Sequence, residues 1–321
     1  MSASLNRRQF VKAAVVAGAT VPAVLGAEPP VSPTPPMAGP TGPLAPVQGT
    51  LPKGKIQGME FSRLMLGGNL IGGYAHSRDL AYVSHLMKRY NTDAKILETL
   101  ELAEIHGITV INSWVQDGIA HLQQHWKRGG KMKWIAQVRI NPNGDFGQIQ
   151  KAADLGASAI HVTGDVADAL VAQGKLDVIA RLLDFIRERQ CIAGVGAHGL
   201  ATIVECEKAK LNPDFYVKTL HSHAYHTAPK PGETDDLGRY DNSWCSDPEA
   251  VVDVMFTVQK PWIAFKVLAA GAIPPAQGFR YAFEGGADFI LVGMFDWQIA
   301  EDAQLTREVL ADLKRVRPWR S

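Results

Sequence analysis

The chain has few cysteines and almost no net charge, and both shortages limit what it can be. Three cysteines in 321 residues, with no CxxC pair, cannot build the disulfide framework of a small secreted scaffold, although one structural disulfide stays open. A formal net charge of +1 provides no basic field for nucleic acid. The sequence also lacks HExxH, a GxGxxG after a strand, and internal repeats. Hydrophobic residues make up 46% of the chain, which is typical of a globular protein.

The first 27 residues resemble a twin-arginine export signal. Arg7 and Arg8 are followed by Phe10, Lys12 and a weakly apolar run of alanine, valine and glycine. Such signals are read by a receptor, and this run is too short and too rich in small residues for a membrane span. We therefore expect the twin-arginine export machinery as a partner, a periplasmic or other extracytoplasmic location, and no stable membrane span in the mature form. An uncleaved anchor is the alternative.

Residues 28–52 have the composition of a disordered, proline-rich linker. Eight prolines lie between residues 28 and 50, among glycine, threonine and alanine. Such a segment cannot pack a core and prefers extended, solvated conformations. We expect the folded catalytic domain to span residues 53–321.

Short apolar runs alternate with amphipathic stretches across this domain. The clearest helix is predicted over 93–107, with Thr92 or Asp93 as its cap and Gly107 as its terminator. Eight strands, each followed by a helix, predict a parallel (β/α)8 TIM barrel, and a doubly wound open sheet is the alternative. The predicted strands are 63–69, 109–114, 134–140, 158–164, 193–199, 215–223, 262–271 and 289–295, and the other clear helices are 145–156, 176–190, 201–210 and 247–259.

Two connections, 71–91 and 226–246, are too long for ordinary loops. Both follow a strand, so we expect them to cover the barrel mouth, where TIM barrels place their sites. Polar side chains also gather at the predicted strand ends. As substrate-binding candidates we take Asn69, Asn112, Trp114 and Arg139 from the strand ends, and His76 and Arg78 from the first long loop.

Histidines and lysines are the candidates for chemistry. His221 and His223 share one face if their strand continues through them, and with His198 from the neighbouring strand they could bind a divalent metal. Lys218 and Lys266 lie inside apolar strands, where loss of solvent lowers the pKa of an ammonium group and suits it to acid/base or Schiff-base chemistry.

Proton transfer then falls to a histidine or a carboxylate among the remaining strand-end residues. Asp117, His161 and His221 are the candidates, and together with Lys218 and Lys266 they make up the predicted catalytic set. For each of these residues a structural role, satisfied by hydrogen bonds, is the alternative.

Four stretches of the sequence resemble the aldo/keto reductases. They are SRLMLGGNLIGG (62–73), ILETLELAEIHGITVINS (96–113), PWIAFKVLAAG (261–271) and ADFILVGMFDWQIAED (287–302). The resemblance covers about residues 55–310 and implies a TIM barrel. The resemblance also implies a nicotinamide cofactor, NADP, whose phosphate is bound near the start of the last helix.

The catalytic residues that this resemblance implies are not retained. The family uses an Asp, a Tyr that donates a proton, a Lys that lowers the pKa of the Tyr, and a His. The Asp position holds Asn112, and the Tyr position holds Asp117. The Lys falls near Gln137, or on Arg139 if the alignment slips.

The family His falls near Thr163, with His161 two residues earlier. The segment FDWQIAED (295–302), at the implied phosphate site, is acidic. These residues therefore argue against the ordinary NADPH-dependent reduction of the family.

We therefore expect an exported TIM-barrel enzyme that acts on a polar carbonyl compound or polyol, including sugar derivatives. The predicted chemistry is proton transfer next to a carbonyl, as in a lyase, hydratase or isomerase, with a lysine or a metal stabilising the oxyanion. One alternative is an NADP-dependent oxidoreductase with an altered acid. The other is a periplasmic barrel that binds a small molecule without catalysis.

Overall fold

The computed structural model describes residues 50–76, 80–141, 143–230 and 244–321. The predicted signal peptide, nearly all of the predicted linker, Arg78 and the middle of the second long loop (231–243) lie outside these residues. Leu51 is 3% exposed and belongs to the main hydrophobic core, so packing begins just before Lys53. Among the described residues, no helix is both long and apolar enough to cross a membrane.

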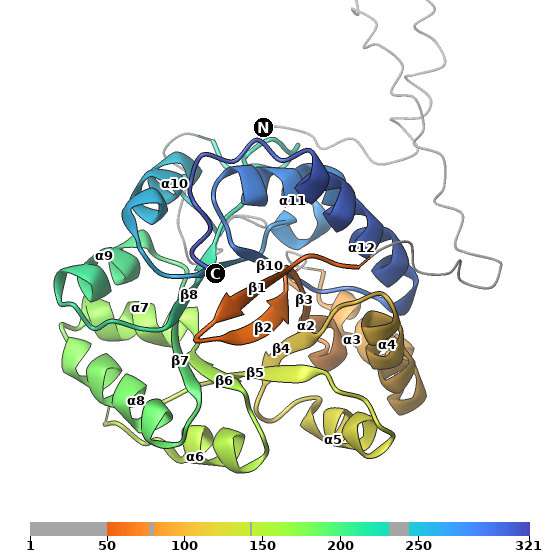
Figure 1. The fold of residues 1–321 in the computed structure, drawn as a ribbon, viewed down its shortest axis with the longest axis horizontal. Helices are drawn as coiled ribbons and strands as arrows, with labels where there is room; N and C mark the ends of the chain where they lie inside the picture. The colour runs from red at the N-terminus through yellow and green to blue at the C-terminus, as the bar shows by residue number, and fades with distance from the viewer. Residues whose placement is uncertain (1–49, 77–79, 142, 231–243) are drawn as a thin grey trace, which may run out of the picture. The chain divides into compact units, whose positions relative to one another are not determined.

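Eight parallel strands form a closed barrel, as the sequence predicts (Figure 1). Each strand pairs with its neighbours in chain order, and β10 closes the ring against β3 through Ile290 opposite Leu64. The open-sheet alternative is therefore wrong. The strands are β3 (Leu64–Gly67), β4 (Val110–Trp114), β5 (Lys133–Val138), β6 (Ala159–Val162), β7 (Ile192–Ala197), β8 (Phe215–Thr219), β9 (Trp262–Phe265) and β10 (Phe289–Val292).

Helices form the outer layer of the barrel (Figure 1). In α4 the Thr92 side chain accepts the Lys95 amide as an N-cap, and Ile96, Leu100 and Ala103 bury one face. All five clear helix predictions are confirmed. The helices are α2 (Asn69–Gly72), α3 (Tyr82–Tyr90), α4 (Asp93–Ile105), α5 (Ile119–Lys127), α6 (Gly147–Asp154), α7 (Gly164–Ala172), α8 (Leu176–Glu188), α9 (Leu200–Lys208), α10 (Pro248–Thr257), the 3₁₀ turn η1 (Ala269–Gly271), α11 (Pro275–Glu284) and α12 (Asp296–Ala311).

A short hairpin precedes the barrel and was not predicted from the sequence. Strands β1 (Lys53–Ile56) and β2 (Met59–Ser62) pair in antiparallel fashion. The two loop residues, Gln57 and Gly58, both have positive φ (48° and 78°), as a two-residue type I′ turn requires. The hairpin lies across one end of the barrel in Figure 1. Its Ile56 and Phe61 belong to the same buried cluster as barrel residues such as Phe289, so the hairpin plugs that end.

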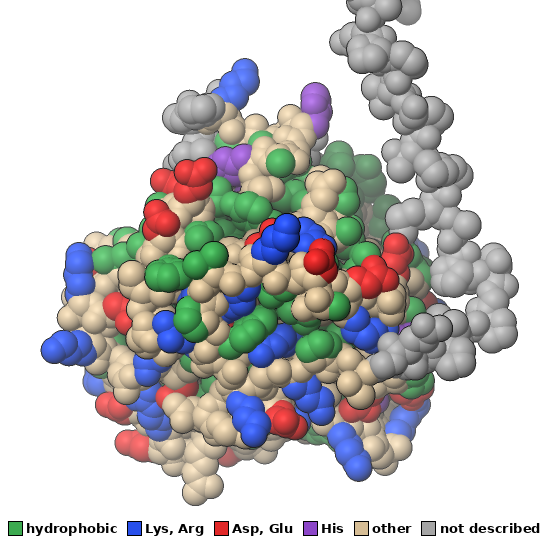
Figure 2. Space-filling view, turned by 45° about the horizontal axis from the view of Figure 1, so that its top comes forward, with side chains coloured by type: hydrophobic (Ala, Val, Ile, Leu, Met, Phe, Trp, Pro, Cys, Tyr) green, Lys and Arg blue, Asp and Glu red, His purple; other side chains and the backbone are tan. Residues whose placement is uncertain are grey.

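Alternation along the strands divides the buried residues into two cores. In β8, Phe215 and Val217 belong to the smaller cluster inside the barrel, whereas Tyr216 belongs to the larger cluster between barrel and helices. This alternation determines which strand residues can reach the barrel mouth. On the face drawn in Figure 2, basic and acidic side chains are interspersed, without a broad field of one sign.

A buried charged cluster locks the hairpin end of the barrel, and we call it the floor cluster: Arg63, Asp288, Arg315 and Arg317. Asp288 is fully buried and lies 2.7 Å from Arg317 and 3.4 Å from Arg315. The main chain at Trp262 and Arg320 also donates to its carboxylate, and Arg63 donates to its carbonyl oxygen at 2.8 Å. These bonds fasten the C-terminal segment beneath the barrel.

Candidate active site at the barrel mouth

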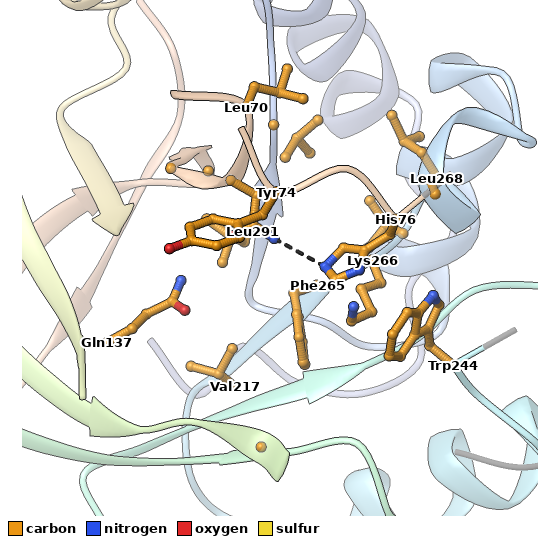
Figure 3. Close-up of a pocket in the computed structure, with 18 of the residues that line it drawn as sticks. Leu70, Tyr74, His76, Gln137, Val217, Trp244, Phe265, Lys266, Leu268 and Leu291 are labelled. Atoms are coloured by element: carbon orange, nitrogen blue, oxygen red, sulfur yellow. Dashed lines mark hydrogen bonds between the residues drawn. The ribbon is translucent and has the colours of Figure 1, made fainter. Parts of the chain in front are cut away.

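A cavity of about 600 Å³ opens at the C-terminal ends of the barrel strands (Figure 3). Its wall includes strand-end residues from all around the barrel, and α2, the segment between α2 and α3, and α3 contribute Leu70, Tyr74, His76 and Met87. The first long loop therefore covers the mouth, as predicted, and Trp244 at the end of the second long loop also lines it. Cavities of this size hold small molecules.

The cavity brings together seven of the predicted site residues and leaves out others. The seven that line it are Asn69, His76, Trp114, Arg139, His161, His198 and Lys266. Lys218, Asn112, Asp117, His221 and His223 are not among the lining residues, and Arg78 lies outside the described residues.

Lys266 follows β9 directly and extends along the cavity wall toward Trp244. Its backbone is in the left-handed region (φ 58°), which takes the side chain out of the strand's alternation. Its ammonium lies 3.3 Å from the centre of the Trp244 ring. Within the described chain no carboxylate forms an ion pair with it, and burial lowers its pKa to about 7, against a weaker opposing effect of Asp165. A lysine in this state is an amine that titrates near neutral pH.

His76 and His198 complete what we call the mouth cluster: Lys266, Trp244, His76 and His198. The two imidazoles contact Trp244, with ring centres 4.8 Å and 5.5 Å from it. Desolvation, followed by the positive charges of Lys266 and His198, lowers the pKa of His76. In Figure 3, His76 lies beside Lys266, and the Asn69 amide donates to it at 3.3 Å.

His221 and His223 hold the backbone of the second long loop and do not form the predicted metal site with His198. The premise of one continuous strand is wrong, because β8 ends at Thr219. His221 Nδ1 donates to the Ser222 carbonyl, and its Nε2 accepts the Trp244 amide at 3.0 Å. His223 Nε2 donates to the Cys245 carbonyl at 2.8 Å.

His221 therefore positions Trp244 over Lys266. Burial lowers the pKa of His221 to about 4, which keeps its accepting nitrogen unprotonated. In the part of the chain that the structure describes, no group of three His, Cys, Asp or Glu residues could hold a metal ion.

Lys218 is fully buried but is not part of the cavity wall, in contrast to its predicted catalytic place. It follows Val217, which faces the barrel interior, so alternation turns Lys218 toward the helices. Its ammonium donates to the His198 carbonyl at 2.6 Å and to the Thr219 hydroxyl at 2.7 Å. These contacts hold the Lys218 side chain at the β7–β8 junction.

Neutral side chains lie at the bottom of the mouth cavity, at positions where the resemblance to aldo/keto reductases implies charged side chains. Asn112 is fully buried; its amide NH₂ donates to His161 Nε2 at 3.0 Å, and its oxygen accepts the Gln137 amide. His161 Nδ1 donates to the Val162 carbonyl, and burial lowers its pKa to about 4. This network supplies hydrogen bonds but no charge, and of its members His161 and Gln137 reach the cavity.

Tyr74 is a cavity residue that sequence reasoning missed. Its hydroxyl donates to Asp117 at 2.7 Å, and that hydrogen bond is the main cause of its raised pKa. A tyrosine in a long polar loop carries no periodic signal, so only the fold brings it next to Asp117. The predicted Asp117 thus reaches the mouth through Tyr74.

The start of α12 does not fit the phosphate of a dinucleotide. Asp296 occupies the first turn, its side chain is 13% exposed, and it binds Lys95 at 3.0 Å and Tyr90 at 2.6 Å. An internal carboxylate therefore already uses the positive end of this helix. The residues present disagree with the NADP site that the resemblance implies.

Comparisons with known proteins agree with the fold. No protein-family model matches the sequence, and neither does any curated protein. Two solved structures of a Pseudomonas aeruginosa protein assigned as an aldo-keto reductase are similar, at 15% identity and a TM-score of 0.57, over 82% of this chain and 98% and 99% of theirs. A phospho-2-dehydro-3-deoxyheptonate aldolase from Thermotoga maritima matches at 12% identity and a TM-score of 0.49, over 82% of this chain and 74% of the aldolase. The chain thus has a (β/α)8 barrel with distant structural similarity to aldo-keto reductases.

Proposed function

We propose that this protein is an enzyme that acts on small carbonyl compounds and uses Lys266 as its reactive amine. The observation that carries the proposal is the environment of Lys266 in the mouth cluster. Its amino group borders the cavity, has no carboxylate partner in the described chain, and has a pKa lowered to about 7 by burial. Near neutral pH much of this amine is uncharged, and the uncharged form attacks a carbonyl carbon.

The chemistry that follows is imine formation. Lys266 Nζ adds to the carbonyl carbon, and the carbonyl oxygen leaves as water together with the two hydrogens of the amine. The imine withdraws electrons from the adjacent carbon, so that a proton or a carbon substituent leaves that carbon more easily. This gives isomerase or lyase chemistry, and water then releases the product and restores the amine.

We assign to His76, which the sequence predicts as a substrate-binding residue, the role of accepting the proton that leaves the adjacent carbon. It lies beside Lys266, and burial lowers its pKa to about 3, so that it is neutral near pH 7 but a weak base. Trp114, Trp244 and Phe265 give the cavity flat apolar surfaces, which suit the C–H faces of a polyol or sugar-derived carbonyl compound. Export by the twin-arginine route remains a prediction from the sequence.

Borohydride trapping tests this function. Borohydride reduces an imine to a secondary amine, which adds the mass of the carbonyl compound less one oxygen atom. With a panel of small aldehydes, ketones and sugars, we expect an adduct on Lys266 in a peptide digest. Lys266→Arg keeps a cation but removes the nucleophile, so the adduct should disappear. Lys208→Arg, at a lysine whose side chain is 67% exposed, is the matched control and should leave trapping unchanged.

Two results would count against the proposal. One is the absence of an adduct with every compound, which would favour a barrel that binds ligands without catalysis. The other is labelling spread evenly over exposed lysines and unchanged in Lys266→Arg, because that would show ordinary lysine reactivity.

A further inference from the structure

The junction between β6 and α7 carries a second feature of the same cavity. Thr163 lines the cavity, is only 5% exposed, and occupies the N-cap position of α7. Its hydroxyl does not cap the helix, and it makes no hydrogen bond to any described residue. Buried hydroxyl groups almost always have a partner, because leaving one without a partner costs free energy. A ligand bound in the cavity could supply the missing hydrogen-bond partner of the Thr163 hydroxyl.

The direction of the Thr163 side chain follows from the strand that precedes it. Ala159 belongs to the cluster inside the barrel, and His161 lines the cavity; Thr163 continues this alternation onto the same face. The Thr163 side chain therefore lies on the cavity side of the strand and not on the helix side, and its hydroxyl oxygen is buried there.

The start of α7 adds further hydrogen-bond donors. The first amides of a helix lack partners within the helix and carry the positive end of its dipole. Two glycines keep this end open to the cavity. A Cβ at Gly164 would lie 2.8 Å from His198 Nδ1, and a Cβ at Gly196 would lie 2.9 Å from the Gly164 nitrogen. Both glycines line the cavity, so the space that side chains would fill adjoins the helix start.

The charged residues that line the cavity at this junction do not oppose an anion, and the nearby carboxylate of Asp168 is taken up by the amides of His198 and Gly199. Asp165, in the first turn of α7, is paired with Arg139 at 2.5 Å, so its charge is offset. Lys266 shares the cavity, has no ion-pair partner in the described chain, and is near enough for Asp165 to act on its pKa. The charged residues that line the cavity, Arg139, Asp165 and Lys266, therefore sum to a positive charge when Lys266 is protonated and to zero when it is the uncharged amine, so no net negative charge of this wall opposes an anion.

We propose that the Thr163 hydroxyl and the first turn of α7 bind a carboxylate group of the substrate. This proposal rests on the proposed function of Lys266, and it narrows the substrate class to oxo acids. The carbonyl carbon of such an acid meets Lys266 while its carboxylate accepts hydrogen bonds from Thr163 and the helix start. A helix N-terminus with a hydroxyl donor is a common way to bind an anion.

Paired probes separate this proposal from the proposed function. Trapping is measured with pyruvate against acetone and with levulinate against 2-pentanone, so that each pair differs in the carboxylate. In the wild type, the oxo acid should reach half-maximal trapping at a concentration about tenfold or more below that of its ketone. Thr163→Val should remove that advantage, so that the oxo acid and its ketone reach half-maximal trapping at similar concentrations.

Thermal stability gives an independent readout with a matched control. Thr163→Val removes a hydroxyl without a partner, so the melting temperature should stay the same or rise. Thr306→Val is the control, because Thr306 is also fully buried but its hydroxyl donates to the Asp302 carbonyl at 2.8 Å. This control should melt at a lower temperature and keep the full preference for oxo acids.

Direct binding keeps the proposal testable if no imine forms. Propanoate, which has no ketone, is titrated against the wild type and Thr163→Val by NMR. Weaker binding to Thr163→Val supports the carboxylate subsite even where trapping fails, and then only the proposed role of Lys266 falls. Equal binding to both proteins, equal trapping of acids and ketones by the wild type, or stronger binding of inorganic phosphate than of propanoate overturns the subsite.

Discussion

The two ends of the barrel differ in whether their buried charged side chains form ion pairs. In the floor cluster, Asp288 meets Arg315 and Arg317, and main-chain groups take up the remaining hydrogen bonds. In the mouth cluster, Lys266 faces an indole ring and two histidines and has no carboxylate ion pair in the described chain. A cluster whose charged groups all have hydrogen-bond partners serves to hold the chain together, whereas a charged group without an ion pair beside a cavity is a feature of functional sites. The comparison predicts that the floor cluster contributes stability and that, under the proposed function, the mouth cluster contributes reactivity.

Asp288→Asn should have the largest effect of any change discussed, and the effect should be on stability. The substitution keeps the shape of the side chain but removes the negative charge that offsets Arg315 and Arg317 inside the protein. Loss of one member of a buried ion pair costs about 3–5 kcal/mol, so the free energy of unfolding should fall by about that much. Urea denaturation followed by circular dichroism measures it.

The control for this change is Asp312→Asn, at an aspartate whose side chain is 80% exposed and lies 3.7 Å from Arg280. Its effect should stay within about 0.5 kcal/mol. The fraction of Asp288→Asn that remains folded should still be trapped at Lys266. If Asp288→Asn proved as stable as the wild type, the floor cluster would not hold the fold.

Lys266→Met should show the opposite behaviour, with little loss of stability and a particular dependence on pH. The pKa of Lys266 is about 7 in the folded protein, below the ordinary lysine value of 10.5. Between these values the unfolded chain binds more protons than the folded one, so wild-type stability rises with pH across that window. The full cost of the buried ammonium is present below about pH 7. Met carries no such cost.

The stability gain of Lys266→Met over the wild type should therefore be largest near pH 6 and shrink as the pH rises toward about 10. Thermal melts over this pH range, with Lys208→Met as an exposed control, measure the difference. A gain that does not change with pH would show that Lys266 keeps an ordinary pKa, and a gain that grows in alkali would show that its pKa is raised in the folded protein. Either result would contradict the contrast between the two ends.

The barrel could be predicted from the sequence because its signals are local and repeated. Each strand is a short apolar run, and helices such as α4 carry a cap, a periodic face and a terminating glycine. The β1–β2 hairpin could not be predicted from the sequence because each of its strands has only four residues. Its packing against the end of the barrel also depends on contacts with residues as distant in sequence as Phe289.

The site was predictable in its position but not in its details. Convergence of strand ends correctly indicated His161, His198 and Lys266 as cavity residues. Whether Lys218 faces the barrel interior or the helices depends on the exact register of β8. A shift of one residue along the strand would turn its side chain to the opposite face. The hydrogen bonds from Trp244 to His221 and from Tyr74 to Asp117 join residues that are far apart in the sequence. No local sequence pattern predicts such contacts.

Tyr74→Phe should produce the smallest effect, and it tests whether Lys266 alone accounts for reactivity at the mouth. Tyr74 is 43% exposed, so loss of its 2.7 Å hydrogen bond to Asp117 should change the free energy of unfolding by no more than about 0.5 kcal/mol. Imine trapping should stay near the wild-type rate, because the phenol is not the attacking amine. Denaturation and the trapping rate are measured together, with Tyr82→Phe at an exposed tyrosine as the control. If trapping instead dropped as far as in Lys266→Arg, the Tyr74–Asp117 pair would be moving a proton in imine formation, and reactivity would belong to both sides of the cavity.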